Sequence, residues 1–600
     1  MSGGPGRGLL GNCAFMVALA VTVAAAGGGG GDSRPAGPLI TNQGLTPPRI
    51  VSFAPGITQV LFALGADEQV VGVTRLCRLP AGVQRPRVGD AFNINTEAIL
   101  ALRPDLILTQ VTTEKFRGLV DIDPHVRVEY VDMVSLAEIR TAVRRIGELA
   151  GRADRAAAVL GDFDAKLRAV RRRAAGLPRP RVVFVMGTDR PTAFADGTYV
   201  GDLIELAGGI NVGAEIPGTT RWRMTHIDAI AALRPDVLVC QIDQGADAGA
   251  ARRYWLKWRD LPTARSGRVF VVTDPMWTIP GTHVADLAGR LAEMIHGGAA
   301  PRAGDSPRAT LSLWEARLWR LLAAAIVGAA LGAAGMALQG LLRNPLAEPY
   351  ILGVSSGAGV GVLLGLAAAA WLAVPAWAST PVLAFAGALA TCAAVYLIAQ
   401  RHGRLDPYAL ILSGVIVNTF NGAIMLTIYL YVDPHRIADF AHWAMGRLPD
   451  SLDTHLLGVC GLLVLGGWGV LLACGPAFNV LGLGDAVAAS SGVAVGRLRL
   501  ATFACAAVMT AAAVALAGPV GFLGLIVPHL VRMVLGAEHR AGLAGAGLAG
   551  AALLVAAELA CRAAGPLVGV SLIPVGILTA LAGGPFFIVL LRRRFREVAP

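Results

Sequence analysis

The chain has 600 residues, of which 54% are hydrophobic, and its mean hydropathy is +0.59. A single core is too small for this length, so at least two domains are expected, and the apolar excess falls in the second half. The formal net charge of +11 comes from scattered basic residues, so nucleic acid is excluded as an expected partner.

The N-terminus has a basic residue, Arg7, followed by an apolar run at 9–26 and five glycines at 27–31. This order is typical of a secretory signal peptide or an uncleaved signal anchor, which we assign to residues 1–31. Either form places residues 32–310 outside the cytoplasm.

The segment that follows alternates strands and helices. Residues 49–53 and 70–73 are β-rich runs separated by a helical pattern. Residues 97–110 and 228–241 repeat each other at a constant offset of 131, and each copy reads as a helix, a Leu-Arg-Pro-Asp turn and a buried strand. Two similar lobes with a cleft between them are therefore predicted.

Between the two copies, residues 135–175 carry apolar positions at helical spacing and contain no proline. We expect one long helix that joins the lobes and keeps the cleft stiff. Cys77 and Cys240 could pair across this half, although two buried free thiols are the favoured reading.

The run 48–52, with Pro55, Thr58 and both Leu-Arg-Pro-Asp repeats, resembles the periplasmic binding proteins for cobalamin, ferric siderophores and haem. The resemblance covers 48–297 and implies two α/β lobes bridged by a long helix; Gln59 departs from the family's usual Glu. Cationic and aromatic side chains suit a large anionic or conjugated ligand, although exposed arginines are also common in this chain. The ligand candidates are Arg75, Arg78, Arg221, Trp222, Arg223 and Trp277.

The second half reads as a bundle of membrane-spanning helices behind a connector at 298–310. A span needs about 20 apolar residues. Nine candidates qualify: 318–340, 350–373, 380–400, 406–431, 454–474, 498–517, a short one at 521–535, 542–562 and 570–591. With the N-terminal segment the total is about ten. The fold class is thus a two-lobed α/β binding domain followed by an all-α polytopic membrane domain at 311–592.

Counting spans inward from the extracytoplasmic half places Arg343, Arg497, Arg499 and Arg540 on the cytoplasmic side, as the positive-inside rule expects. The same count places Arg317, Arg320 and Arg562 at the outer edge.

Three groups of motifs resemble the permeases of cobalamin and iron-chelate ABC importers: residues 339–349 with 352–358, residues 518–532, and residues 574–576 with 583–586. Gly and Pro inside spans are tolerated where the backbone faces protein or an aqueous path, and Gly518, Gly521 and Gly524 are expected to let helices pack closely. By resemblance the motif and pathway residues are Gln339, Asn344, Pro345, Gly353, Ser355, Gly357, Gly521, Gly524, Pro528, His529 and Arg532.

The resemblance also implies that one acid on each lobe docks on outer arginines of the permease. The acids are Glu97 and Asp228, and the arginines are Arg317, Arg320 and Arg562. The alternative is that both acids only favour a helix N-terminus through its dipole. By the same resemblance, Arg343, Leu483, Asp485 and Ala486 contact the ATPase subunits, the alternative being a plain connector.

We therefore expect the fused receptor and permease of an ABC importer for a metal chelate, with ferric siderophore first, cobalamin second and haem third. None of the three lysines lies in a G-K-[ST] context, so ATP hydrolysis belongs to partner ATPase subunits. The chain itself is not an enzyme and binds no metal or cofactor; a second permease copy is its other expected partner. The alternative class is a membrane-anchored ligand sensor, which would require a cytoplasmic effector domain.

Overall fold

The structure is a computed structural model that describes residues 47–600 except 91–93, 189–190, 298–311, 373–375, 402–403, 431, 433, 450–452, 566–572 and 599–600. The N-terminal segment predicted at 1–31 and the connector predicted at 298–310 lie outside the described residues.

Lobe 1 is built on a four-stranded parallel sheet with the strand order β2-β1-β3-β4. The β-rich runs predicted near 49–53 and 70–73 are its first two strands. Its elements are β1 (Ile50–Phe53), α2 (Pro55–Ala63), β2 (Val70–Val73), α3 (Thr96–Ala101), β3 (Leu106–Thr109), α4 (Arg117–Ile122) and β4 (Arg127–Tyr130).

Lobe 2 has a six-stranded sheet with the order β10-β9-β5-β6-β8, and β7 pairs with β5. The strands β10, β9, β5 and β7 are parallel, whereas β6 and β8 run antiparallel to their neighbours. Its elements are β5 (Arg181–Met186), β6 (Thr192–Phe194), α7 (Tyr199–Leu206), β7 (Ile210–Asn211), β8 (Trp222–Met224), α8 (Ile227–Ala232), β9 (Val237–Gln241), α9 (Ala248–Leu256), α10 (Pro262–Ser266), β10 (Val269–Val272) and α11 (Val284–His296).

The predicted repeat is confirmed in detail, because its two copies are α3 with β3 and α8 with β9. In both turns the arginine has a left-handed backbone, with φ of 43° at Arg103 and 47° at Arg234. The aspartate of each turn accepts a hydrogen bond from a backbone N–H at the start of a neighbouring strand. Asp105 accepts from Arg49 N, just before β1, at 2.7 Å, and Asp236 accepts from Arg181 N of β5 at 2.8 Å. The Leu-Arg-Pro-Asp turn therefore ties each repeat helix and strand to its sheet.

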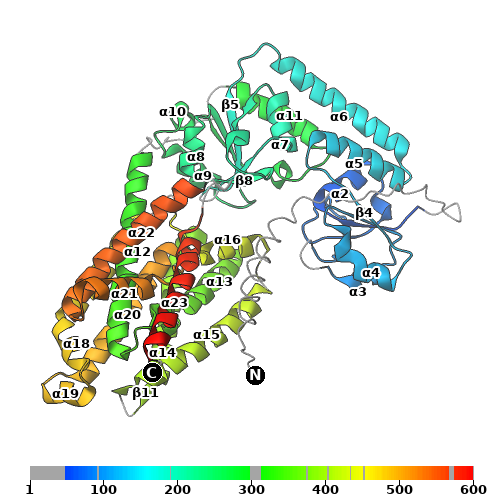
Figure 1. Ribbon diagram of the computed structural model, residues 1–600. Helices are drawn as coiled ribbons and strands as arrows, with labels where there is room; N and C mark the ends of the chain where they lie inside the picture. Colours follow the sequence, from blue (N-terminus) through cyan, green and yellow to red (C-terminus); the bar gives the residue numbers. More distant parts are fainter. Residues whose placement is uncertain are drawn as a thin grey trace, which may run out of the picture. The chain divides into compact units, whose positions relative to one another are not determined.

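The stretch predicted as one helix over 135–175 is two helices, which corrects that prediction. Helix α5 (Leu136–Leu149) starts with a capping box between Ser135 and Glu138, and α6 (Ala153–Ala174) is the long helix of the pair. Gly151 between them has a φ of +66°, a conformation that ends a helix and that glycine adopts without strain. Figure 1 shows α5 and α6 as neighbouring helices. One buried apolar cluster combines both helices with residues from both sheets, so the lobes share a core.

All nine segments predicted as spans are helical. They form α12 (Leu313–Leu342), α13 (Val354–Leu372), α14 (Ala376–Ile398), α15 (Pro407–Tyr429), α17 (Thr454–Ala473), α20 (Val495–Ala517), α21 (Leu523–Leu535), α22 (His539–Ala564) and α23 (Val575–Val598). Among the described residues, six helices are long and apolar enough to cross a membrane, and three shorter apolar helices lie in α13, α21 and α23. The total of about ten spans is not confirmed.

Three short helices, α16 (Pro434–Ala444), α18 (Gly475–Leu481) and α19 (Asp485–Ser490), lie between the predicted spans. The described cysteines are all free, and Cys77 and Cys240 are buried thiols, as favoured.

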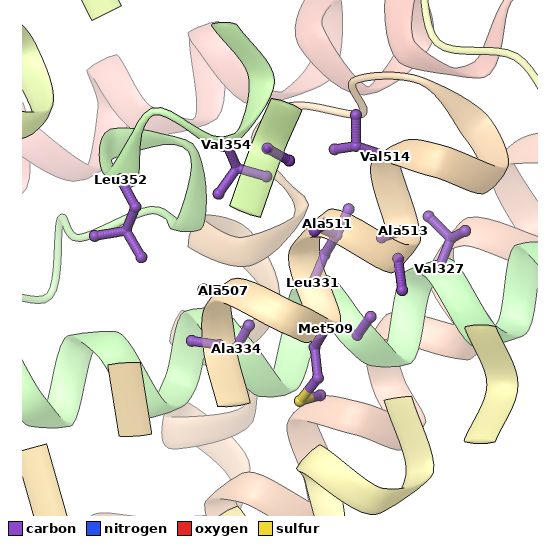
Figure 2. Packing of buried hydrophobic residues seen from close by; sticks show 14 of the residues in the cluster. Val327, Leu331, Ala334, Leu352, Val354, Ala507, Met509, Ala511, Ala513 and Val514 are labelled. Carbon is purple, nitrogen blue, oxygen red and sulfur yellow. The ribbon is translucent and has the colours of Figure 1, made fainter. Parts of the chain in front are cut away.

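Helix α12 is largely buried and lies beside α22 and α20 (Figure 1). Its glycines allow this approach: a Cβ on Gly332 would stand 2.2 Å from the carbonyl oxygen of Ala546 in α22. Figure 2 shows Val327 and Leu331 of α12 near Met509 and Ala513 of α20, all of them buried. The bundle is therefore organised around α12.

Candidate functional sites

Asp228 lies in the first turn of α8 and contacts three arginines of the membrane half. Its carboxylate accepts hydrogen bonds from Arg317 Nε at 2.9 Å and Arg320 Nη2 at 2.8 Å, both on α12, and from Arg562 Nη1 on α22 at 3.4 Å. These four residues were predicted as a docking group. The structure brings all four together.

The cluster is largely shielded from water, because the side chains of Asp228 and Arg320 are 12% and 3% exposed. Arg562 also pairs with Glu558 on the same helix: Arg562 Nε donates a hydrogen bond to Glu558 Oε1 at 2.7 Å. Sequence reasoning gave Glu558 no role, although its spacing of four residues before Arg562 was a readable signal of a helical ion pair.

The charge balance of the cluster predicts a pH dependence. Burial opposes ionisation of Asp228, but Arg320, Arg317 and Arg562 outweigh it, so the pKa of this carboxyl lies below its usual value. A lowered pKa means that the contact is fully stabilised above the ordinary aspartate pKa of about 3.9 and is lost as pH falls through the lowered value.

We expect the contact between lobe 2 and the membrane half to persist at neutral pH and to weaken in strong acid. Energy transfer between a dye on lobe 2 and one on the membrane half would measure this contact. Asp228→Asn should contact the arginines less tightly at neutral pH and lose the pH step; an unchanged step in that variant would assign the titration to another group.

Glu97 occupies the equivalent position of lobe 1, in the first turn of α3. It is exposed, and within the described residues no ion pair of Glu97 is found. The predicted pair of acids is thus divided: the structure joins Asp228 to the arginines and leaves Glu97 apart from them.

Four of the six ligand candidates are available to a ligand. Arg75 is 59% exposed and pairs with Asp90; Arg78 donates to Gln244 of lobe 2 at 2.7 Å. Arg221 lies 3.3 Å from Glu138, and Trp222 is 45% exposed. Residues 75, 78 and 244 follow the carboxyl ends of parallel strands, where open α/β sheets bind ligands.

The side chains of Arg223 and Trp277 make contacts within the protein instead of facing the cleft. Arg223 donates to the carbonyl oxygens of Thr220, Ala214 and Ile216 and so fixes the loop around it. Trp277 is 1% exposed, and its ring lies 5.9 Å from that of Phe184. Assigning Trp277 to the cleft was wrong, because the apolar cluster beneath the sheets buries it.

A cavity of about 400 Å³ lies beside α6, between α2 and α11. Its polar lining includes Lys166, which pairs with Asp162 and Asp286 at 3.1 and 2.8 Å, and also Arg155 and His283. None of the six ligand candidates lines it, so this cavity and the predicted ligand cleft are different places.

In the membrane half, the first and second motif groups meet at Gln339 and Arg532. Arg532 donates to the side-chain oxygen of Gln339, whose amide nitrogen donates to the carbonyl oxygens of Ala347 and Gly524 at 3.2 and 3.3 Å. Glu348 accepts a hydrogen bond from Phe522 N at 2.6 Å. The two motif groups therefore form one polar network rather than two separate packing features.

The remaining motif residues are placed as follows. Asn344 accepts from Leu346 N at 3.0 Å, Pro345 and Ser355 are half-buried, Gly353 has a φ of +80°, and Pro528 is buried inside α21. Gly357 lets α13 approach Thr391 of α14, and His529 lies 6.0 Å from the Phe586 ring. Ser356, which sequence reasoning missed, accepts from Asn421 at 3.0 Å and bonds Asn418 at 2.6 Å.

Gly521 does not have the packing role that was expected. A Cβ there would meet nothing within 4 Å, whereas one on Gly524 would stand 2.6 Å from Pro349. Glycine is also favoured at position 518 by the backbone, because its φ of +68° lies in the left-handed region that other residues rarely adopt. The expectation of close packing was therefore correct for Gly518 and Gly524 and wrong for Gly521.

The far end of α12 carries a second ionic cluster. Arg343, with a left-handed φ of 47°, ends the helix and pairs with Asp485 at the start of α19, and Arg499 of α20 approaches the same carboxylate at 2.6 Å. Leu483 is 74% exposed and Ala486 is exposed beside it. A charged junction thus fixes α19 while an apolar surface next to it stays accessible.

Comparison with known proteins gives the same division of the chain. The profile of the FecCD transport family matches residues 288–593, and that of the periplasmic binding protein family matches 50–276. The cobalamin import system permease protein BtuC of Halobacterium salinarum is 42% identical over 279 residues, which are 46% of this chain and 72% of that protein.

Two further similar proteins each match one half of the chain. The hemin transport system permease protein HmuU of Yersinia pestis is 40% identical over 280 residues, 46% of this chain and 82% of that protein. A periplasmic heme binding protein structure from Pseudomonas aeruginosa is 24% identical, with a TM-score of 0.38, and covers 44% of this chain and 99% of that one.

Proposed function

Because the chain belongs to the FecCD transport family and carries a periplasmic binding protein domain before its permease, we propose that it imports an iron(III)-siderophore, with ATP hydrolysed by separate subunits. The family makes it a membrane transport protein for cobalamin, haem or iron chelates rather than an enzyme. The observation that carries a receptor-to-permease transfer is the Asp228 cluster, which joins lobe 2 of the binding domain to helices α12 and α22 of the permease.

The cleft residues support an anionic chelate as the cargo. Arg78 and Arg221 come from different lobes, and the exposed Trp222 ring adds an apolar face for a large organic ligand. Guanidinium groups bind carboxylate and hydroxamate-type oxygens through paired hydrogen bonds, and aromatic faces stack on conjugated groups.

Cobalamin is the second candidate, because a permease named for cobalamin import is 42% identical to this chain, against 36% for one named for iron(III)-citrate import. Haem is the third, on the likeness to the hemin permease.

The second half of the proposal concerns partners. Asp228 uses the arginines of its own chain, so the arginines that receive Glu97 belong to a second permease subunit. ATPase subunits would bind at α19, where the exposed Leu483 lies next to the Asp485 junction.

The cargo can be identified on the full chain purified from its own host with bound ligand. Metal analysis and absorbance separate the three candidates: iron without a haem absorption band indicates a siderophore, iron with that band indicates haem, and cobalt indicates cobalamin. The expected result is iron without the haem band. ATP hydrolysis by the purified ATPase complex should rise when that ligand is added, and an unresponsive complex would contradict import.

A further inference from the structure

The first turn of α12 is packed into the core of lobe 2. Ala316 is 3% exposed and belongs to the buried cluster that contains Trp255 and Trp258, and Leu313 packs against the same cluster. A residue at the start of a membrane helix thus completes the apolar core of the receptor. Separating the two would expose the edge of that core to water, which is unfavourable in proportion to the apolar area uncovered.

We call this contact of Leu313 and Ala316 with the core of lobe 2 the apolar seat. Polar contacts surround it. Asp260 Oδ2 accepts a hydrogen bond from Leu313 N at 2.6 Å, and Arg259 lies 3.5 Å from Glu315. The same Glu315 closes a capping box with Ser312. One of the N–H groups that every helix start leaves without an internal partner is therefore satisfied by lobe 2.

These contacts continue directly into the docking cluster, since Arg317 and Arg320 follow on the next turn. An exposed ion pair alone contributes little to stability, because water and salt screen its charges. Here the apolar seat, the Asp260 hydrogen bond and the buried Asp228 cluster act on one helix end, and the covalent connection holds the parts together at an effective concentration of roughly millimolar or more.

We propose that residues 255–261 of lobe 2 and 312–316 of α12 form a permanent interface within one chain, so that lobe 2 stays seated on the permease throughout the transport cycle. This inference rests on the proposed import function. It assigns a task to residues outside the docking group: Asp260, Arg259 and Ala316 hold the receptor in place, and ligand enters and leaves with lobe 2 still attached.

A reversible cross-link tests the proposal. Asp260→Cys with Leu313→Cys places two thiols at an existing contact, where an oxidised pair can form if the Cα atoms lie within about 7 Å. Uptake is measured in cells that contain the ATPase partner, before and after oxidation and after reduction. The probes are ferric enterobactin with radioactive iron, which is an anionic chelate, cyanocobalamin with radioactive cobalt, and haemin.

The expected result is that oxidation cross-links nearly all chains and leaves the uptake rate unchanged. A matched control joins the two lobes instead, through Arg78→Cys with Gln244→Cys and a short bifunctional thiol reagent. Because Arg78 is itself a ligand candidate, the same variant is compared before and after linking, and linking should abolish its remaining uptake because the cleft can no longer open. Each single-cysteine variant controls for the native thiols.

Three outcomes are decisive. Uptake lost on oxidation and restored by reductant overturns the permanent seat while leaving import intact. Failure of folded chains to cross-link, both in this pair and in Arg259→Cys with Glu315→Cys, overturns the interface itself; the second pair also serves if the first variant does not fold. Absence of uptake of all three probes by the unaltered chain counts against the proposed function and is seen before any variant is made.

Discussion

Replacing Asp228 with arginine is expected to reduce uptake to background while leaving ligand binding intact. The change removes the carboxylate that contacts Arg317, Arg320 and Arg562 together and adds a fourth cation beside them. Removing one member of a buried ion pair costs about 3–5 kcal/mol, because the remaining charge is left uncompensated. Arg320 is the residue most affected, since its side chain is 3% exposed.

The control is Glu293→Arg, which reverses an exposed acid on α11 of the same lobe that has no ion pair within the described part of the chain. This variant should transport normally. Ligand affinity of both full-length variants, measured by tryptophan fluorescence in detergent, should match that of the unaltered chain. Normal uptake by Asp228→Arg would remove the docking role from this cluster.

Glu97→Arg extends the same experiment to lobe 1. It should also lower uptake, but without changing the contact of Asp228, because its proposed partner is a second permease subunit. The double variant should be inactive and still bind ligand. A Glu97→Arg variant that transports normally would show that lobe 1 needs no ionic contact.

Gly332→Ala is expected to destabilise the permease strongly although it adds only one methyl group. The new Cβ would lie 2.2 Å from the carbonyl oxygen of Ala546, and a backbone atom cannot move aside as a flexible side chain can. Overpacking of this kind costs about 1–3 kcal/mol, and here it also separates α12 from α22. Figure 2 shows the adjoining face of α12 already filled by Leu331 against α20.

The matched control is Gly466→Ala in α17, where a Cβ would meet nothing within 4 Å. Because alanine favours the helix by up to about 1 kcal/mol over glycine, this variant should be as stable as the original or slightly more so. Yield of folded protein and thermal unfolding in detergent distinguish the two. Equal stability of both variants would mean that the close approach of α12 to α22 is not required.

The sequence predicted elements well wherever a local pattern decides the structure. The 131-residue repeat predicted two equivalent helix–turn–strand units, and apolar runs located the nine apolar helices described in the membrane half but not the short helices α16, α18 and α19. The break at Gly151 was missed because the apolar periodicity continues on both sides of it. Two features of the sequence indicated that one helix ends here and another begins. Gly151 is a typical residue after a helix end, and Asp154 is an acid of the kind that favours the first turn of a new helix.

Side-chain environments were harder to predict, because they depend on residues far away in the sequence. Trp277 looked suitable for a ligand cleft by its chemistry, but burial against Phe184 decides its role. Gly521 and Gly524 are indistinguishable by pattern, yet of these two only Gly524 lies so close to a neighbouring element that a Cβ would clash with it. The contact of Asp228 with three arginines followed from resemblance and topology, whereas Asp260 carried no sequence signal at all.

Helix α12 joins the two ionic clusters in one continuous rod. It is 30 residues long, about 45 Å at 1.5 Å per residue, and has no proline within it. Its first turns contact lobe 2 through Ala316 and Arg320. At its other end, Arg343 pairs with Asp485 of α19, the helix at which we propose that the ATPase subunits bind. Between these ends its glycines fit it closely against α22.

A rod fixed at both ends and closely fitted along its length can slide or tilt only as a unit. A displacement of lobe 2 would therefore reach the α19 end of α12 without passing through any loop. If the ATPase subunits bind at α19 as proposed, a single helix connects the receptor contact with the motor contact.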